Sequence, residues 1–172
     1  SEITRRLMNF SRNVAEEPRM EEVFVNQPIE ETVAIVQHEY RVNRIEIVLA
    51  LQQNLPPVIA NPGALQQVFL NMLINARDAM PDGGTITIST ESSGFYVVVK
   101  FSDTGTGIAQ EHLDKIFMPF FTTKGEGKGT GLGLSICRKI ISEHKGEIKV
   151  ESTLGKGTTF SIFLPTRRRL QR

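Results

Sequence analysis

The chain has 172 residues, 40% of them hydrophobic, and its 20 basic residues nearly balance 19 acidic ones, leaving a net charge of +1. This length and apolar content suit one domain with a real core, and the small net charge offers no general attraction to nucleic acid or membrane surfaces. A single cysteine, Cys137, excludes an internal disulfide and a zinc site built on thiolates. We therefore predict a cytoplasmic domain that does not bind nucleic acid. Because the sequence begins with Ser1 instead of Met, we expect a processed protein or a fragment of a longer one. The expectation of a cytoplasmic domain is compatible with a parent protein that is anchored in a membrane.

The N-terminal segment has the apolar spacing of a helix. Four apolar residues follow one another at spacings of four, three and four: Ile3, Leu7, Phe10 and Val14. This spacing predicts a seam against a partner helix, with a frayed surface helix as the alternative. A polar stretch around Pro18 interrupts the pattern. We therefore expect a helix remnant at 1–17, the main domain at 18–166, and a basic tail at 167–172 that is solvated.

The first half of the main domain alternates short strands with helices. We expect an extended run at residues 23–25, a helix from Pro28 and, from the alternation of apolar residues, a strand at 45–51. The strongest amphipathic pattern begins at Pro62 and stops at the turn 81–84. This pattern predicts the most clearly amphipathic helix of the sequence.

The second half begins with two alternating runs, at 86–88 and 95–101, joined by the turn residues 92–94, which predicts a pair of antiparallel strands. A helix at about 132–143 and two final strands, around 148–150 and 160–164, complete the order of elements. This order predicts an α+β fold in which helices cover one face of a mixed sheet.

The long predicted helix carries a polar stripe beside its apolar face. Its members are three or four residues apart: Gln67, Asn71, Asn75 and Asp78. Carboxamide oxygens are suitable ligands for Mg²⁺, which takes its other oxygens from water and nucleotide phosphates. An ordinary solvated helix face explains the stripe equally well.

Asp103 directly follows a predicted strand and precedes Gly105 and Gly107. A carboxylate at a strand end, beside glycines that let a ligand approach the backbone, is able to accept a hydrogen bond from the exocyclic amine of adenine. Asp and Gly are also favoured in simple turns, and the motif alone favours that interpretation.

Five alternating glycines lead into the last predicted helix: Gly125, Gly127, Gly129, Gly131 and Gly133. Backbone amides at a helix N-terminus suit triphosphate oxygens, and Lys124 and Lys128 add positive charge. A flexible linker is the alternative. The spacing fits neither a dinucleotide fingerprint nor a P-loop.

Three phenylalanines precede this glycine run: Phe117, Phe120 and Phe121. Aromatic side chains beside a mobile loop are able to anchor a lid over a bound ligand. A small cluster of core side chains is a nearly equal alternative.

Together these segments resemble the histidine kinase branch of the Bergerat-fold ATPases, which also includes gyrase, Hsp90 and MutL-type proteins. The resemblance covers about residues 20–165 and consists of five boxes in the family's order. They are the asparagine box at 67–76, the first glycine box at 103–107, the phenylalanine box at 117–121, the second glycine box at 129–134 and a last box at 155–160. The fold implied is a two-layer α/β sandwich.

The resemblance implies a role for each matching residue. Asn75 would bind Mg²⁺ with the help of Asn71, and these two with Lys124 would form the catalytic group. Asp103 would bind adenine, and Thr158 would support its pocket. The implied ATP-binding set is Asp103, Gly105, Gly107, Ile108, Phe120, Lys124, Gly129, Thr130, Gly131, Leu132, Gly133, Leu134 and Thr158. Some histidine kinases carry a lysine three residues after the metal-binding asparagine, where this chain has Asp78, so one cation on the phosphate side is in doubt.

Residues 6–12 resemble the end of the second helix of a dimerisation hairpin, whose first helix would carry the acceptor histidine upstream of this sequence. His38 superficially resembles that acceptor, but no proline follows it as in the family, and we expect it on the domain's first helix. The implied partners are the hairpin of the same kinase and a response regulator, with the parent protein a homodimer.

The function implied is transfer of the ATP γ-phosphoryl group to a histidine on that hairpin. The residues around Asn75 resemble the nitrogen-regulation and oxygen-sensing branch. Two alternatives stay open: an ATP-hydrolysing clamp like gyrase or Hsp90, and a non-catalytic nucleotide-sensing module.

Overall fold

The computed structural model describes Ile3, residues 19–122 and residues 133–171. Its centre is a five-stranded sheet with the strand order β2-β4-β5-β7-β6. The strands are β2 (Ile45–Leu51), β4 (Gly84–Ser93), β5 (Tyr96–Asp103), β6 (Glu147–Thr153) and β7 (Gly157–Pro165). β2 runs parallel to β4, and the other neighbouring pairs are antiparallel. The predicted mixed sheet is confirmed, including the hairpin of β4 and β5.

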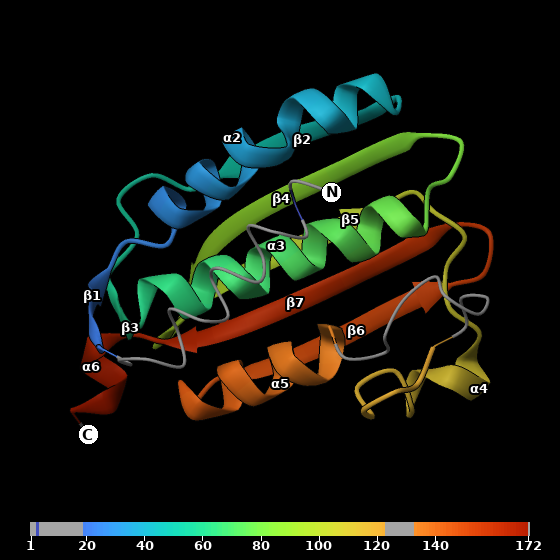
Figure 1. Cartoon of the computed structure of the whole chain (residues 1–172). Coiled ribbons are helices and arrows are strands. Elements are labelled where there is room, and N and C mark those ends of the chain that lie inside the picture. The colour runs from blue at the N-terminus through green and yellow to red at the C-terminus, as the bar shows by residue number, and fades with distance from the viewer. Residues whose placement is uncertain (1–2, 4–18, 123–132, 172) are drawn as a thin grey trace.

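Three helices cover one face of this sheet (Figure 1): α2 (Asn26–Val42), α3 (Pro62–Asp78) and α5 (Gly133–Glu143). α3 lies between the other two and supplies much of the core. Its Phe69 packs on Phe101 of β5 with ring centroids 5.8 Å apart, and both side chains are buried. The fold is therefore the predicted two-layer α/β sandwich. No helix in the described part of the chain is long and apolar enough to cross a bilayer.

A second, two-stranded sheet pairs β1 (Glu21–Val23) with β3 (Val58–Ala60). The expected extended run at 23–25 was placed two residues late, because Val25 already has helical backbone angles before α2. α2 therefore begins two residues before Pro28, which is tolerated in a first helical turn. β3 was not predicted from the sequence.

The basic tail is exposed in its described part, as expected, and it also contacts the domain. Residues Arg167–Leu170 form a short helix, α6, beside the small sheet (Figure 1). The Arg167 side chain forms an ion pair with Glu22 of β1, and the Arg168 guanidinium lies 5.7 Å from the centre of the Phe95 ring. These contacts attach the tail to the domain. Of the predicted helix remnant at 1–17, only Ile3 is described, and it is buried.

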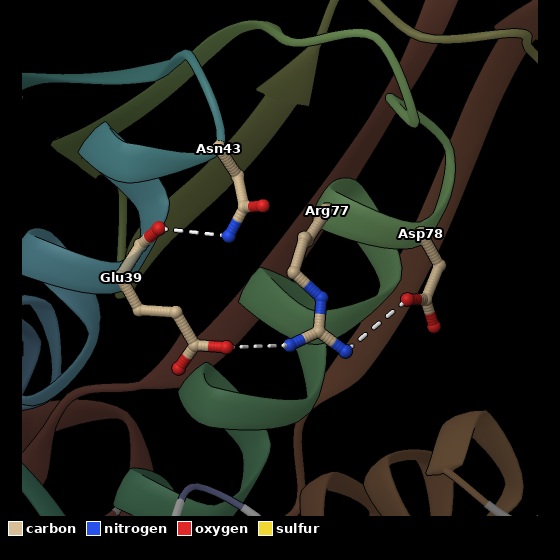
Figure 2. A network of polar contacts seen from close by, with 4 residues as sticks. All are labelled: Glu39, Asn43, Arg77 and Asp78. Carbon is tan, nitrogen blue, oxygen red and sulfur yellow. Dashed lines mark hydrogen bonds and ion pairs between the residues drawn. The ribbon is translucent and has the colours of Figure 1, made fainter. Parts of the chain in front are cut away.

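A polar network joins α2 to the C-terminal end of α3 (Figure 2). Arg77 of α3 lies 3.6 Å from a carboxylate oxygen of Glu39 and 3.3 Å from one of Asp78. The Asn43 side chain caps α2 by donating to the backbone carbonyl of Glu39. Arg77 also lies over the ring of Tyr40, the hydroxyl of which has its pKa raised by burial. The charged side chains at this end of α3 therefore form ion pairs with one another.

His144 ties the end of α5 to the start of α3. Its Nδ1 lies 2.7 Å from the carbonyl oxygen of Ile140 and its Nε2 lies 3.0 Å from the backbone nitrogen of Asn61. A carbonyl only accepts, so Nδ1 carries the proton and Nε2 accepts the N–H of Asn61. The Asn61 side chain in turn accepts from Ala64 N and caps α3. The neutral imidazole is therefore a bridge between two helices.

We predict that His144→Ala lowers the free energy of unfolding by about 2–3 kcal/mol, because it leaves buried hydrogen-bonding groups unpaired and a small cavity. His38→Ala is the matched control. His38 is exposed on α2, as expected from the sequence, and its loss should change stability by less than about 0.5 kcal/mol. Urea denaturation of both variants measures the difference, and equal effects would contradict the bridging role.

Candidate functional site

Three polar side chains lie in one row at the end of the main sheet. The strand register pairs Asp103 of β5 with Thr158 of β7, and Thr158 with Ser152 of β6. Directly paired residues share a face of a sheet, and alternate residues of a strand do too. Phe101, two residues before Asp103, is buried against α3, so the row faces the helical layer. The fold therefore brings Asp103 and Thr158 together from separate boxes.

The Asp103 carboxylate is held through one of its two oxygens. Oδ1 accepts from the backbone nitrogens of Gly105, at 2.9 Å, and Thr158, at 3.3 Å. Burial raises the pKa of this carboxyl, although both hydrogen bonds act in the opposite direction. Within the described part of the chain, no hydrogen bond reaches Oδ2. That oxygen therefore keeps its capacity to accept a hydrogen bond.

Two glycines allow the backbone to pass close to this row. Gly157 has a φ of +116°, and a Cβ there would lie 2.0 Å from the carbonyl oxygen of Asp103. Gly107 has a φ of +75°, and its Cβ would lie 2.2 Å from the carbonyl oxygen of Thr153. Any other residue would be strained at both positions. Both glycines thus let one segment of the chain pack closely on another, and for Gly107 this packing adds to the ligand approach expected from the sequence.

Ser152 is part of the site, although sequence analysis did not identify it. Its hydroxyl accepts a 2.7 Å hydrogen bond from the backbone nitrogen of Ile108, and its carbonyl accepts one of 3.0 Å from the Gln110 side chain. The loop after the first glycine box is thereby fastened to β6. A tight turn at Gly155, between β6 and β7, was the available signal, because it places Ser152 opposite Thr158.

The asparagine helix reaches the same region. The backbone nitrogen of Thr106 donates to the carbonyl oxygen of Ala79, the residue that follows α3, at 3.0 Å. The nitrogen of Ala79 in turn donates to the carbonyl oxygen of Asn75. Asn75 therefore lies one helical turn from the loop after Asp103.

The polar stripe on α3 is not an ordinary solvated face. Gln67 and Asn71 are buried, and Asn75 is half-buried. The Asn71 side chain donates to the carbonyl oxygen of Gly133, at 3.4 Å, and hydrogen-bonds to the Cys137 thiol. Burial raises the pKa of that thiol to about 12. Asn71 therefore connects α3 to the first turn of α5.

The donor chemistry on α3 fits a magnesium ion that arrives with a nucleotide. Among the residues that the structure describes, no group of three His, Cys, Asp or Glu side chains is arranged to hold a metal ion. Mg²⁺ retains water and phosphate oxygens, so it needs only one or two oxygen ligands from the protein. The carboxamide of Asn75 is suited to supply one.

The phenylalanine box divides into two parts. Phe117 packs edge-on against Phe160 at 6.3 Å, and Phe121 lies 5.5 Å from the His112 ring, so both belong to the edge of the core. Phe120 is 75% exposed and has a φ of +65°. The interpretation as a core cluster therefore applies to Phe117 and Phe121, whereas Phe120 projects outward.

The structure describes part of the predicted phosphate segment. Gly133 and Leu134 begin α5, and among the described residues a Cβ at Gly133 would meet nothing outside its own helix and chain neighbours within 4 Å. The remaining predicted residues of that segment lie outside the described residues: Lys124, Gly129, Thr130, Gly131 and Leu132.

A separate open groove runs along α5. Its walls come from the phenylalanine box and from α5: Phe117, Pro119, Ser135, Ile136, Arg138, Lys139 and Ser142. None of the predicted ligand-binding residues that the structure describes lines this groove, and neither Asp103 nor Thr158 of the row at the sheet end is among its walls.

Residues 60–168 match the family model described as histidine kinase-, DNA gyrase B-, and HSP90-like ATPase. Sporulation kinase E of Bacillus subtilis is 40% identical over 148 residues, which make up 86% of this chain and 20% of that protein. Sensor histidine kinase ZraS of Escherichia coli K12 is 38% identical over 146 residues, or 85% of this chain and 31% of that protein. The chain thus spans about a fifth to a third of these two relatives.

Solved structures agree with the sequence comparison. The nucleotide-free catalytic domain of histidine kinase ThkA superposes with a TM-score of 0.78 at 36% identity, covering 86% of this chain and 96% of that one. A crystal structure of ThkA with the response regulator TrrA gives a TM-score of 0.77 at 30% identity, covering 98% of this chain and 49% of that one. The likeness therefore extends over most of this chain.

We predict that Asp103→Asn becomes increasingly more stable than the unsubstituted chain as the pH rises above 3.8, the ordinary pKa of the group. The raised pKa means that the folded state holds its proton longer than the unfolded state does, so stability falls as pH rises through the interval between the two values. Asparagine keeps the Oδ1 acceptor without the charge.

Urea unfolding at about pH 4 and about pH 7 measures this difference. Asp82→Asn, in an exposed turn, is the control. A stability advantage of Asp103→Asn that shrinks with rising pH would contradict the buried-charge explanation.

Proposed function

Because this chain belongs to the family of histidine kinase-, DNA gyrase B-, and HSP90-like ATPases, as a catalytic domain of the histidine kinase type, we propose that it binds ATP at the row of Asp103, Thr158 and Ser152. We further propose that the parent protein transfers the γ-phosphoryl group to a histidine on a dimerisation hairpin. The observation that carries this proposal is the Asp103 carboxylate, held through Oδ1 with Oδ2 left for a donor.

The adenine end of the site is supported by the chemistry of its acceptors. An exocyclic amine has N–H groups and no lone pair suited to accept, so a partly buried carboxylate is a matching partner. Partial burial strengthens such a bond relative to one in water. Thr158, beside Asp103, completes the polar end of the pocket.

The phosphate end lies toward α3 and the start of α5. We propose that Asn75 provides an oxygen ligand for Mg²⁺ and that Asn71, held by Gly133, keeps α3 and α5 in register there. The N-terminus of α5 favours anions, and Lys124 with Gly129 and the neighbouring glycine-box residues would enclose the phosphates. Mg²⁺, when bound, supplies neutralisation of the charge on the phosphate oxygens. The protein's contribution is positioning.

A hydrolysing clamp is less well supported by this site. The gyrase-like and Hsp90-like members use a glutamate four residues before the metal-binding asparagine to activate water, and this chain has Asn71 there. A carboxamide is not basic, and this one is occupied with Gly133 and Cys137. An asparagine at position 71 therefore favours phosphoryl transfer to a separate acceptor over hydrolysis of ATP.

The partners that we propose follow from this chemistry. His38 lies on α2 and is exposed. We propose that it is not the acceptor and that the acceptor histidine lies on a hairpin preceding residue 1, in a homodimeric parent protein. A response regulator would then receive the phosphoryl group, and the ThkA–TrrA complex is an example of such a pairing in a relative.

We predict that the chain binds ATP and that Asp103→Ala lowers its affinity at least about tenfold, because a hydrogen bond to a charged group is lost. Asn75→Ala should instead abolish the increase in affinity that Mg²⁺ provides, while binding without Mg²⁺ is retained. Calorimetry with and without Mg²⁺ measures both effects. Equal binding by all three proteins would exclude the site.

We also predict that the chain phosphorylates a dimerisation hairpin supplied in trans and does not phosphorylate itself. Transfer of radiolabelled γ-phosphate from ATP measures phosphorylation of the hairpin and of the chain. Acid treatment then removes the label if it is attached to histidine. His38→Gln should transfer at an unchanged rate. Steady release of phosphate without transfer would favour the clamp, and ATP binding with neither reaction would favour the non-catalytic module.

A further inference from the structure

The Ser152 hydroxyl has three hydrogen-bonding neighbours and one proton. The backbone nitrogen of Ile108 lies 2.7 Å away, the carbonyl oxygen of Gly157 3.0 Å and the Thr158 hydroxyl 2.8 Å. The amide of Ile108 can only donate, and the carbonyl of Gly157 can only accept. The roles of these two neighbours are therefore settled by their chemistry.

The direction of the third hydrogen bond follows from the other two. The single proton of Ser152 is directed to the carbonyl of Gly157, so Ser152 has none to give to Thr158. The bond between the two hydroxyls then exists only if Thr158 donates and Ser152 accepts. A serine oxygen has two lone pairs, and Ile108 and Thr158 occupy one each. All three bonds are satisfied in this one arrangement.

This arrangement determines what Thr158 offers to a ligand. With its proton directed at Ser152, the Thr158 oxygen has only lone pairs left. Asp103, paired with Thr158 across β5 and β7, also has only acceptors to offer through Oδ2. The row therefore presents acceptors alone, and a ligand atom that is itself an acceptor would face unmatched lone pairs.

We propose that Ser152 is a positioning residue that selects a 6-aminopurine nucleotide over a 6-oxopurine nucleotide by holding the Thr158 hydroxyl as an acceptor. The proposal rests on nucleotide binding at this row. Adenine presents an amine at position 6, whereas hypoxanthine presents a carbonyl oxygen. If Ser152 loses its hydroxyl, the Thr158 proton is released and can turn toward that oxygen.

The test compares the affinities of ATP and inosine triphosphate for the chain and its variants by calorimetry. Ser152→Ala should lower the ratio of the two affinities by about three- to tenfold, which is the value of one ordinary hydrogen bond. Ser152→Thr keeps a hydroxyl on the same strand and should retain the original ratio. The ratio does not respond to a general loss of folded protein, because that loss affects both nucleotides equally.

A double-mutant cycle isolates the coupling. Thr158→Val removes the hydroxyl that Ser152 orients, so adding Ser152→Ala to it should leave the ratio unchanged. If Ser152→Ala weakens both nucleotides equally, or lowers the ratio in the Thr158→Val background too, Ser152 only fastens the Ile108 loop and the inference is overturned. If the unsubstituted chain binds neither nucleotide, the proposed ATP site itself fails. The two failures are therefore distinguishable.

Discussion

The burial of α3 between α2 and α5 is the constraint on which the rest of the structure depends. Its apolar side packs on the sheet, with Phe69 against Phe101. At its N-terminus Asn61 is held by His144, and at its C-terminus Arg77 connects it to Glu39. A helix fixed at both ends places every residue between them. The position of Asn75 relative to the sheet is therefore set by contacts of other residues, and the Asn71 side chain adds a further link from α3 to α5.

The row at the sheet end differs from α3, because it destabilises the fold: it keeps a charged side chain in a partly buried place. The Asp103 carboxyl has a raised pKa, which means that the fold would be more stable with that group uncharged. Sites that recognise ligands commonly retain such unfavourable groups, and the rest of the core must offset the cost. Here the offset comes from a continuous apolar core beneath the three helices.

Local patterns in the sequence predicted the elements that are long and regular. The amphipathic helix beginning at Pro62 and the hairpin of β4 and β5 follow from periodicity and turn residues, because both signals act within a few residues. β3 is three residues long and has too few positions to show any period. Its pairing with β1 depends on tertiary contact, which leaves no local trace. The attachment of Arg167 to Glu22 is missed for the same reason.

At the site, too, neighbouring sequence indicated some residues, whereas others could be identified only from contacts between segments far apart in the chain. Asp103 was recognisable as a carboxylate at a strand end, but the residues alone favoured a simple turn. Only the resemblance of ordered boxes indicated that Thr158 belongs beside it, since pairing of β5 with β7 joins positions 55 residues apart. The polar stripe on α3 was equally ambiguous, because burial of Asn71 depends on α5. Ser152 was missed because its partners become visible only with the strand register.

The single cysteine of the chain lies where it can report on the contact between α3 and α5. Cys137 is fully buried, and its thiol lies 3.9 Å from the carbonyl oxygen of Val68 on α3. A thiol reacts as the thiolate, which this environment disfavours, so a reagent reaches it only after the two helices separate. The rate of labelling is therefore a measure of how often the helical layer opens locally. The native sequence thus contains its own probe of this motion, without an added label.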